Sequence, residues 1–161
     1  MGHDVRAGAR RRGCGRDHVG AQRRHHLVHQ RGRKPDVPAG LSDRISATAE
    51  ITEAVAGREL VVVAVPVKAV RATLSAAREA FAPGVALLSL AKGLELGSLK
   101  RVDQIIAEAS GVSASRIAVL SGPNLSREIA ERQPTATVVA ASDVELAKEI
   151  AKACHNSYFR P

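Results

Sequence analysis

Two short motifs carry the residue types best suited to bind or polarise a small polar molecule. In the first, Lys92 directly follows the apolar run 85–91, and an ammonium group in that place can hold a phosphate or polarise a carbonyl oxygen. The second is Ser-Gly-Pro-Asn at 121–124, which also ends an apolar run. Its Gly122 allows close approach of the backbone, and its Asn124 has a side-chain amide that can donate to a substrate oxygen.

A helical pattern begins directly after the second motif. A strand that ends where a helix begins offers free backbone N–H groups, which is a place to hold an anion. Ser126 lies in the first turn of this pattern, where its hydroxyl and N–H could face a ligand.

Each of these residues also has an ordinary structural interpretation. Lys92 could be a solvated residue at the end of a strand, Gly122 a turn glycine and Asn124 a cap of the following helix. Ser126 fits ordinary helix-start chemistry equally well. The pattern alone leaves both interpretations open.

From residue 37 onward the chain predicts strands that alternate with helices. Strands are expected within 45–57, 59–66, 85–93, 117–122, 135–141 and 157–160, and helices within 45–57, 67–81, 98–111, 125–131 and 143–155. Most of the strands are unbroken apolar runs, which is typical of a parallel sheet covered by helices on both faces. The predicted fold class is therefore α/β.

Ligands of such sheets bind beyond the carboxyl ends of the strands. Pro66, Lys92-Gly93 and the motif at 121–124 follow the ends of three predicted strands. We therefore expect these three segments to meet at one edge of the sheet.

Two finer expectations concern the helices. The helix within 98–111 should turn Leu99 inward together with Val102 and Ile105. Ser142 and Glu145 have the spacing of a capping box for the helix within 143–155.

The net charge of +8 is concentrated at one end of the chain. Residues 1–34 contain ten lysines and arginines against two acids, whereas residues 35–161 contain fourteen of each. Residues 11–35 show no apolar period and hold few large apolar side chains, so they cannot bury enough surface to offset the entropy of ordering. We therefore divide the chain into a basic, largely irregular segment, 1–36, with a possible short strand at 4–9, and an α/β domain, 37–161.

Several function classes find little support. His25, His26 and His29 lack carboxylate or cysteine partners at a useful spacing, and the arginines around them would repel a metal ion, so we expect no metal. The arginines could bind nucleic acid through phosphates, but no interleaved aromatic residues or recognition helix indicate specific binding. No apolar run approaches the length of a membrane span, and two distant cysteines, Cys14 and Cys154, favour a reducing cytoplasm.

The two motifs, with the continuous stretch from about Val37 to Pro161, resemble the bacterial NAD(P)-dependent glycerol-3-phosphate dehydrogenases. Lys-Gly-x-Glu at 92–95 and Ser-Gly-Pro-Asn at 121–124 match the hallmarks of that family, and Lys92 and Gly122 stand thirty residues apart, as the family pattern requires. The resemblance implies a Rossmann-like, doubly wound, mostly parallel sheet. It also implies that the family's first strand, with its G-x-G-x-x-G loop, and its helical second domain lie outside these 161 residues.

The resemblance implies roles residue by residue. Lys92 would touch both cofactor and substrate, Gly122 and Asn124 would line the substrate, and Ser126 would lie against the cofactor. Arg10 and Arg11 match the basic pair near the adenosine ribose. The cofactor would be NAD or NADP, the substrate pair dihydroxyacetone phosphate and sn-glycerol 3-phosphate, and full-length members would be homo-oligomers. The general acid/base lysine of the family would lie in the second domain, so no catalytic acid or base is assigned here.

Without the first strand, the strand within 59–66 would have an unpaired apolar edge. We therefore expect the 161-residue chain to be marginally stable, inactive, and able to bind dinucleotide weakly or not at all. Turnover of dihydroxyacetone phosphate with NADPH by the purified chain would contradict this expectation.

Two other function classes stay open beside this one. One is a different dehydrogenase with a related cofactor domain, of the 6-phosphogluconate or ketopantoate type, although the joint pattern of the two motifs disfavours it. The other is a non-catalytic fragment or a basic nucleic-acid-binding module that uses residues 6–34. Salt-sensitive retention on DNA that survives deletion of residues 37–161 would favour the module.

Overall fold

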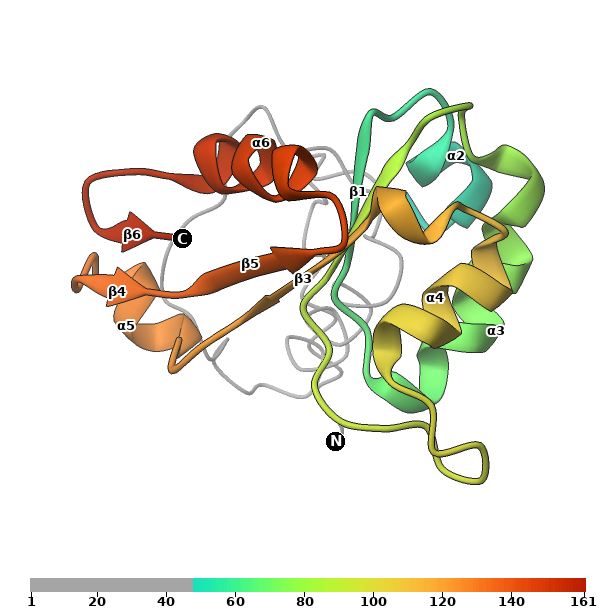
Figure 1. The fold of residues 1–161 in the computed structure, drawn as a ribbon, viewed down its shortest axis with the longest axis horizontal. Helices are drawn as coiled ribbons and strands as arrows, with labels where there is room; N and C mark the ends of the chain where they lie inside the picture. The colour runs from blue at the N-terminus through green and yellow to red at the C-terminus, as the bar shows by residue number, and fades with distance from the viewer. Residues whose placement is uncertain (1–47) are drawn as a thin grey trace, which may run out of the picture.

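The structure is a computed structural model that describes residues 48–161. It forms an α/β arrangement in which helices pack on both faces of a twisted sheet (Figure 1). The predictions for segment 1–36, including the strand at 4–9 and the roles of Arg10 and Arg11, concern residues outside the described part. The histidines at 25, 26 and 29 also lie outside it.

Four strands form the central sheet, in the order β1-β2-β3-β5. Their bounds are β1 Leu60–Val63, β2 Ala86–Ser89, β3 Ile117–Ser121 and β5 Val138–Ala141. The pairs β1–β2 and β2–β3 are parallel, and β5 runs antiparallel to β3. The predicted α/β class with a mostly parallel sheet is therefore confirmed.

Helices cover the two faces of the sheet unevenly. The helices are α2 Ile51–Val55, α3 Val67–Ala77, α4 Val102–Ser110, α5 Ser126–Ala130 and α6 Val144–Cys154, with short 3-10 turns at Arg78–Ala80 and Ala114–Arg116. Helices α3 and α4 lie side by side on one face, and α6 packs on the other (Figure 1). In the part of the chain that the structure describes, no helix is long and apolar enough to cross a bilayer.

The core has two aliphatic clusters, one on each face of β2. Leu87 points to the side of α3 and α4, where it meets Val70 and Ile105, and all three are completely buried. Leu88 points to the opposite side and packs with Leu146 of α6. This alternation explains why β2 has four consecutive buried residues, as a strand covered on both faces should.

The predicted inward position of Leu99 is wrong. Helix α4 begins at Val102, later than the apolar pattern suggested, and Gln104 Oε1 accepts a hydrogen bond from the N–H of the preceding Arg101 at 3.0 Å. Leu99 lies before the helix with a φ of 55° and is 70% exposed. The predicted end is confirmed, because Gly111 closes the helix in the left-handed conformation.

The single strand predicted within 135–141 is divided in two. Thr135–Ala136 forms β4, which pairs in parallel with β6 Phe159–Arg160, whereas β5 joins the main sheet. Thr137 lies at the division: its N–H donates to the Arg160 carbonyl and its hydroxyl to the Ser121 carbonyl. One residue therefore ties the small sheet to the end of β3.

The N-cap of α6 differs from the predicted capping box. Asp143 is the N-cap, and its carboxylate accepts from the backbone N–H groups of Glu145 at 2.9 Å and Leu146 at 3.4 Å. The Ser142 hydroxyl instead donates to the Ala114 carbonyl. The spacing of Ser142 and Glu145 fitted a capping box, but the acidic residue between them fills the cap position.

Replacing Asp143 with alanine should therefore lower the free energy of unfolding by about 1 kcal/mol, because two N–H groups at the start of α6 lose their acceptor. Urea unfolding followed by circular dichroism measures this loss. Ser142→Ala is the matched control, with a smaller expected loss. An equal or larger loss in Ser142→Ala would contradict the assignment of the cap.

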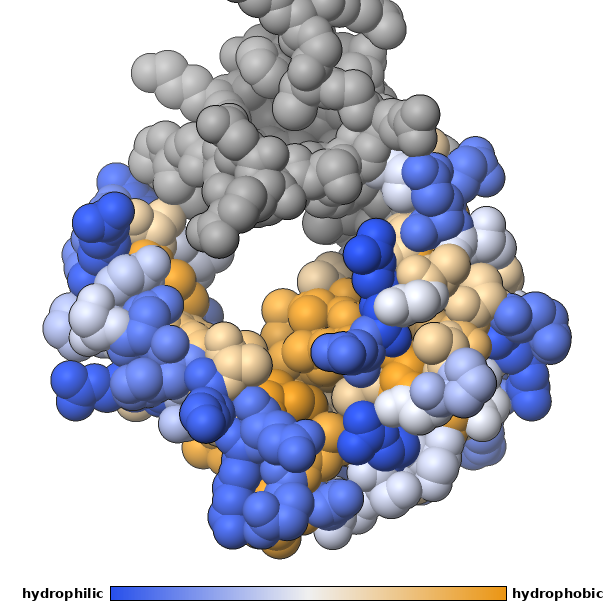
Figure 2. Space-filling model, turned by 90° about the horizontal axis from the view of Figure 1, so that it is seen from above, coloured by the Kyte–Doolittle hydropathy of each residue, from blue (hydrophilic) through white to orange (hydrophobic). Residues whose placement is uncertain are grey.

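Strand β1 lies at one side of the described sheet, with β2 as its partner there. Val62 of β1 is 49% exposed, and a groove of about 420 Å³ runs beside the strand, bordered by residues of α2 and α3. Figure 2 shows hydrophobic side chains gathered in the hollowed part of the described surface, with hydrophilic side chains beside them. An apolar strand in such a place is prone to pair with another chain, as the sequence led us to expect.

Candidate functional site

The carboxyl ends of the three parallel strands meet at one edge of the sheet. Strand β1 runs toward Pro66, β2 toward Lys92-Gly93, and β3 toward the bend at 121–124. Because neighbouring parallel strands run in the same direction, the loops that follow them leave the sheet at the same edge. The structure therefore places the segments as the sequence pattern predicted.

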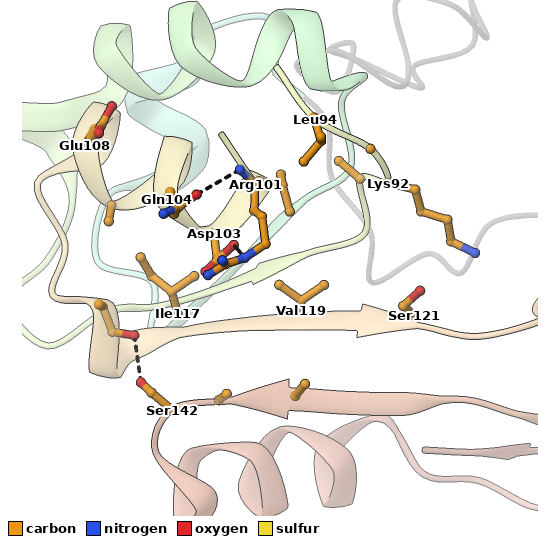
Figure 3. A pocket seen from close by; sticks show the side chains of 17 residues that line it. Lys92, Leu94, Arg101, Asp103, Gln104, Glu108, Ile117, Val119, Ser121 and Ser142 are labelled. Carbon is orange, nitrogen blue, oxygen red and sulfur yellow. Dashed lines mark hydrogen bonds and ion pairs between the residues drawn. The ribbon is translucent and has the colours of Figure 1, made fainter. Parts of the chain in front are cut away.

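Lys92 and Gly122 are in direct contact across the thirty residues that separate them. The Lys92 Nζ donates to the Gly122 carbonyl oxygen at 2.9 Å. The lysine side chain is otherwise exposed, and Figure 3 shows it pointing away from Arg101, at the same end of the sheet as Ser121. An ammonium has three N–H donors, and among the described residues two of them are left for a ligand after this hydrogen bond.

Gly122 is required by close packing. Its φ is not in the left-handed region, but a Cβ built on it would lie 2.9 Å from Thr137 Oγ1 and 3.0 Å from Thr137 Cα. Any side chain here would therefore push β3 and the segment before β5 apart. The glycine lets the two backbones approach, which is more than the turn role considered above.

Asn124 does not cap the following helix. Leu125 is the N-cap of α5, and the Asn124 side-chain amide instead donates to Thr137 Oγ1 at 3.3 Å. The Asn124 backbone N–H donates to the Gly122 carbonyl at 2.9 Å, so this oxygen accepts hydrogen bonds from both Asn124 and Lys92. Half-buried Asn124 is thus fixed within the same cluster as Lys92 and Gly122.

Ser126 is the first residue of α5 and is exposed. Helix α5 has only five residues, so an anion here would depend on individual N–H groups more than on a helix dipole. Ser126 shares the bend with Asn124. Among the described residues, the predicted site residues Lys92, Gly122, Asn124 and Ser126 therefore lie together.

The structure adds a group of charged residues that sequence reasoning missed. Arg71 of α3 binds the Glu95 carboxylate through two parallel hydrogen bonds, each 2.8 Å long, and also reaches Glu108 of α4 at 3.1 Å. Lys100 pairs with Glu108, and the Ser98 hydroxyl donates to Glu95 at 2.6 Å. Glu95 belongs to the Lys-Gly-x-Glu motif and could have been singled out; nothing in the pattern around Arg71 marked it.

The Arg71 guanidinium, and next the Ser98 hydroxyl, lower the pKa of Glu95 from 4.5 to about 2. Because the pKa in the folded state lies below the unfolded value, the carboxylate stabilises the fold fully above pH 4.5, and this contribution is lost as the pH falls toward 2. Glu95→Gln should therefore be less stable than the unmodified chain at neutral pH, with a difference that shrinks on acidification.

Urea midpoints of both proteins measured from neutral pH down to about 2 test this dependence. Glu145→Gln, which removes an exposed carboxylate paired with Lys148 on α6, is the matched control and should show little of it. A constant difference between Glu95→Gln and the unmodified chain over the whole range would contradict the assigned ion pair.

A cavity of about 1050 Å³ lies between α4 and the strands β3 and β5, and it runs along β3 from Ser142 at the amino end to Lys92 at the carboxyl edge (Figure 3). Its floor is apolar and includes Val119 and Ile117, and Lys92 is at its border. Arg101 pairs with Asp103 at 2.9 Å along one wall, and this guanidinium lowers the pKa of the Asp103 carboxyl. The cavity therefore joins an apolar floor to charged groups at the rim.

A mostly parallel sheet between two layers of helices, with the loops that follow its parallel strands gathered at one edge, defines a Rossmann-like domain. The family model for the NAD-dependent glycerol-3-phosphate dehydrogenase N-terminus matches residues 21–147. The chain belongs to this family. The matched range begins before Val37, where the resemblance in the motifs began, and so includes the end of the basic segment.

Individual relatives agree with the family match. The glycerol-3-phosphate dehydrogenase [NAD(P)+] of Thermobifida fusca is 44% identical over 136 residues, which cover 83% of this chain and 40% of that protein. The enzyme of the same name from Nocardia farcinica is 48% identical over 133 residues, which cover 77% of this chain and 40% of that protein. The chain thus spans about two fifths of the length of these curated relatives.

A solved structure shows the same fold. The crystal structure of glycerol-3-phosphate dehydrogenase from Coxiella burnetii superposes with a TM-score of 0.70 at 23% identity, covering 81% of this chain and 38% of that one. The Rossmann-like architecture inferred from the strands and helices is therefore shared with that enzyme.

Proposed function

We propose that this chain forms the cofactor-domain part of an NAD(P)-dependent glycerol-3-phosphate dehydrogenase. The reaction is reversible hydride transfer between NAD(P)H and dihydroxyacetone phosphate, which gives sn-glycerol 3-phosphate. The observation that carries the proposal is the contact of Lys92 with Gly122, because it joins the two family motifs at the carboxyl edge of the sheet.

The residues at this edge fit a nicotinamide dinucleotide and a triose phosphate. Lys92 is exposed with two N–H donors still available, and the neighbouring cavity has an apolar floor that suits a flat ring. When bound, NAD(P)H would supply a hydride to the carbonyl carbon of dihydroxyacetone phosphate and become NAD(P)+, and the carbonyl oxygen would take up a proton. NAD and NADP are both compatible with these residues.

The roles proposed for the residues are those that the resemblance of their motifs to the family implies. Lys92 touches the cofactor and donates to an oxygen of the substrate, which stabilises negative charge on that oxygen. Gly122 and Asn124 line the substrate, and Ser126 lies against the cofactor. Arg10 and Arg11 are proposed near the adenosine ribose. The acid or base that exchanges the proton is assigned to the family's second domain.

The setting of the protein is also proposed. The use of two distant cysteines supports a reducing cytoplasm. From the family resemblance we also propose dihydroxyacetone phosphate as the small-molecule partner and a homo-oligomer as the state of the full-length protein. No specific nucleic-acid partner is proposed. Fractionation of the source cells would overturn the location if the protein were recovered outside the cytoplasm.

A nuclear magnetic resonance titration with millimolar dihydroxyacetone phosphate, and then with NADH, tests the function. The phosphate should shift the backbone amides of Lys92, Gly122, Asn124 and Ser126 in a saturable way, whereas Gly57 and Gly84, which precede β1 and β2 at the opposite edge, should stay unchanged. NADH should add weak shifts at the same edge at most. Shifts that are absent with dihydroxyacetone phosphate, or that spread equally over both edges, would overturn the proposal.

A further inference from the structure

The loop that carries Lys92 is shaped by polar contacts. After β2 the chain forms a loop, residues 92–100, called the Lys92 loop below. Within it the Glu95 N–H donates to the Lys100 carbonyl at 3.0 Å, and the Leu99 N–H donates to the Glu95 carbonyl at 2.9 Å. Its leucines contribute little burial, since Leu94, Leu96 and Leu99 are 52%, 91% and 70% exposed. Apolar packing therefore does not hold this loop in place.

One arginine clamps the loop to the helices behind it. The Arg71 guanidinium grips both Glu95 oxygens in parallel, and its Nη2 also donates to Glu108 of α4. The Ser98 hydroxyl binds one of the same Glu95 oxygens. The result is a connected network that joins α3, the loop and α4.

This network differs from an ordinary surface ion pair, which contributes little to stability. The Glu95 side chain is only 17% exposed, and it accepts from Arg71 in the fork geometry that lysine cannot reproduce. Arg71 can therefore fix the position of Glu95 firmly.

Glu95 stands three residues after Lys92, and between them Gly93 has a φ of 107°, a conformation that glycine adopts readily because it lacks a Cβ. In the part of the chain that the structure describes, the Lys92 side chain makes one hydrogen bond, to the Gly122 carbonyl. We propose that Arg71, acting through Glu95, is a positioning residue that holds the Lys92 loop so that Nζ stays at the carboxyl edge of β3. The catalytic meaning of this positioning rests on the proposed function; the positioning itself does not.

Competitive labelling of lysine amines tests the clamp in the 161-residue chain. An ammonium that donates to Gly122 must leave that contact before it can react with a reagent such as acetic anhydride. In Arg71→Lys and Glu95→Gln, the labelling rate of Lys92 relative to that of the exposed Lys152 on α6 should rise about threefold, as the loss of a restraining hydrogen bond implies. Peptide mass spectrometry gives both rates from the same sample, and Glu145→Gln again serves as the control for a lost surface carboxylate.

Amide hydrogen exchange gives a second readout of the same variants. Exchange at Glu95 and Leu99 should accelerate at least about tenfold relative to the buried amides of β2, since both protons are bonded within the loop. An unchanged Lys92 rate would overturn the proposal even if the loop exchanged faster, because the network would then stabilise the loop without positioning the lysine. An increase in Glu145→Gln as large as in Arg71→Lys would also overturn it.

These readouts need neither dinucleotide nor substrate. A chain that binds no dihydroxyacetone phosphate would refute the proposed function and leave the clamp standing. A Lys92 that labels at the same rate in all variants would refute the clamp and leave the proposed function standing.

Discussion

Replacing Gly122 with alanine should lower the free energy of unfolding by about 2 kcal/mol, the size expected when a group is forced into a well-packed site. The new Cβ would lie 2.9 Å from Thr137 Oγ1 and 3.0 Å from Thr137 Cα, and one of these is backbone that cannot simply rotate away. The end of β3 must therefore move. The same movement should weaken the hydrogen bond from Lys92 to the Gly122 carbonyl.

A double-mutant cycle with Thr137→Ala isolates the steric part of this loss. Removing the Thr137 side chain relieves the contact with Oγ1 but not that with Cα, so the double variant should be more stable than the sum of the single losses predicts. Urea unfolding of the four proteins supplies the values. Strictly additive losses would contradict the close approach of the two segments.

Replacing Leu87 with alanine should cost about 3 kcal/mol and is the largest stability effect that we expect. Leu87 is completely buried in the middle of β2, where it packs against α3 and α4, and the smaller side chain would leave a cavity that these elements cannot close without moving. Because β2 leads into the Lys92 loop, the loss acts directly on the element that positions the site.

Leu96→Ala is the matched control for this prediction. The same atoms are removed from a side chain that is 91% exposed, so the free energy of unfolding should change by less than about 0.5 kcal/mol. Chemical unfolding of both variants gives the comparison. Similar losses in the two variants would mean that the core does not lie where the structure puts it.

The features that the sequence predicted correctly are those that depend on local pattern. Unbroken apolar runs identified β1, β2 and β3, and the helix predicted within 67–81 is α3, whose buried residues Val70, Leu74 and Ala77 recur at three-four spacing. The position of the site followed from these elements, because the ends of parallel strands share one edge. Short motifs at those ends were therefore sufficient to bring Lys92 and Gly122 together in the prediction.

The features that the sequence did not predict depend on contacts between distant residues. The clamp on Glu95 comes from Arg71, twenty-four residues earlier, and an arginine on an exposed helical face has no pattern that marks its partner. The division of the last strand at Thr137 depends on its hydrogen bonds to Ser121 and Arg160. Competition between two suitable caps, Ser142 and Asp143, was likewise decided by the fold and not by spacing.

The most direct test of the account is the dihydroxyacetone phosphate titration repeated on Lys92→Met, with Lys148→Met as the control. Methionine keeps an unbranched chain of similar length but has no N–H donor, so the bend at Gly122 and Asn124 remains while the charge is lost. The account predicts that the saturable amide shifts at Gly122 and Asn124 disappear in Lys92→Met and persist in Lys148→Met. Equal shifts in Lys92→Met and the unmodified chain would contradict the claim that Lys92 and the Ser-Gly-Pro-Asn bend form one substrate site.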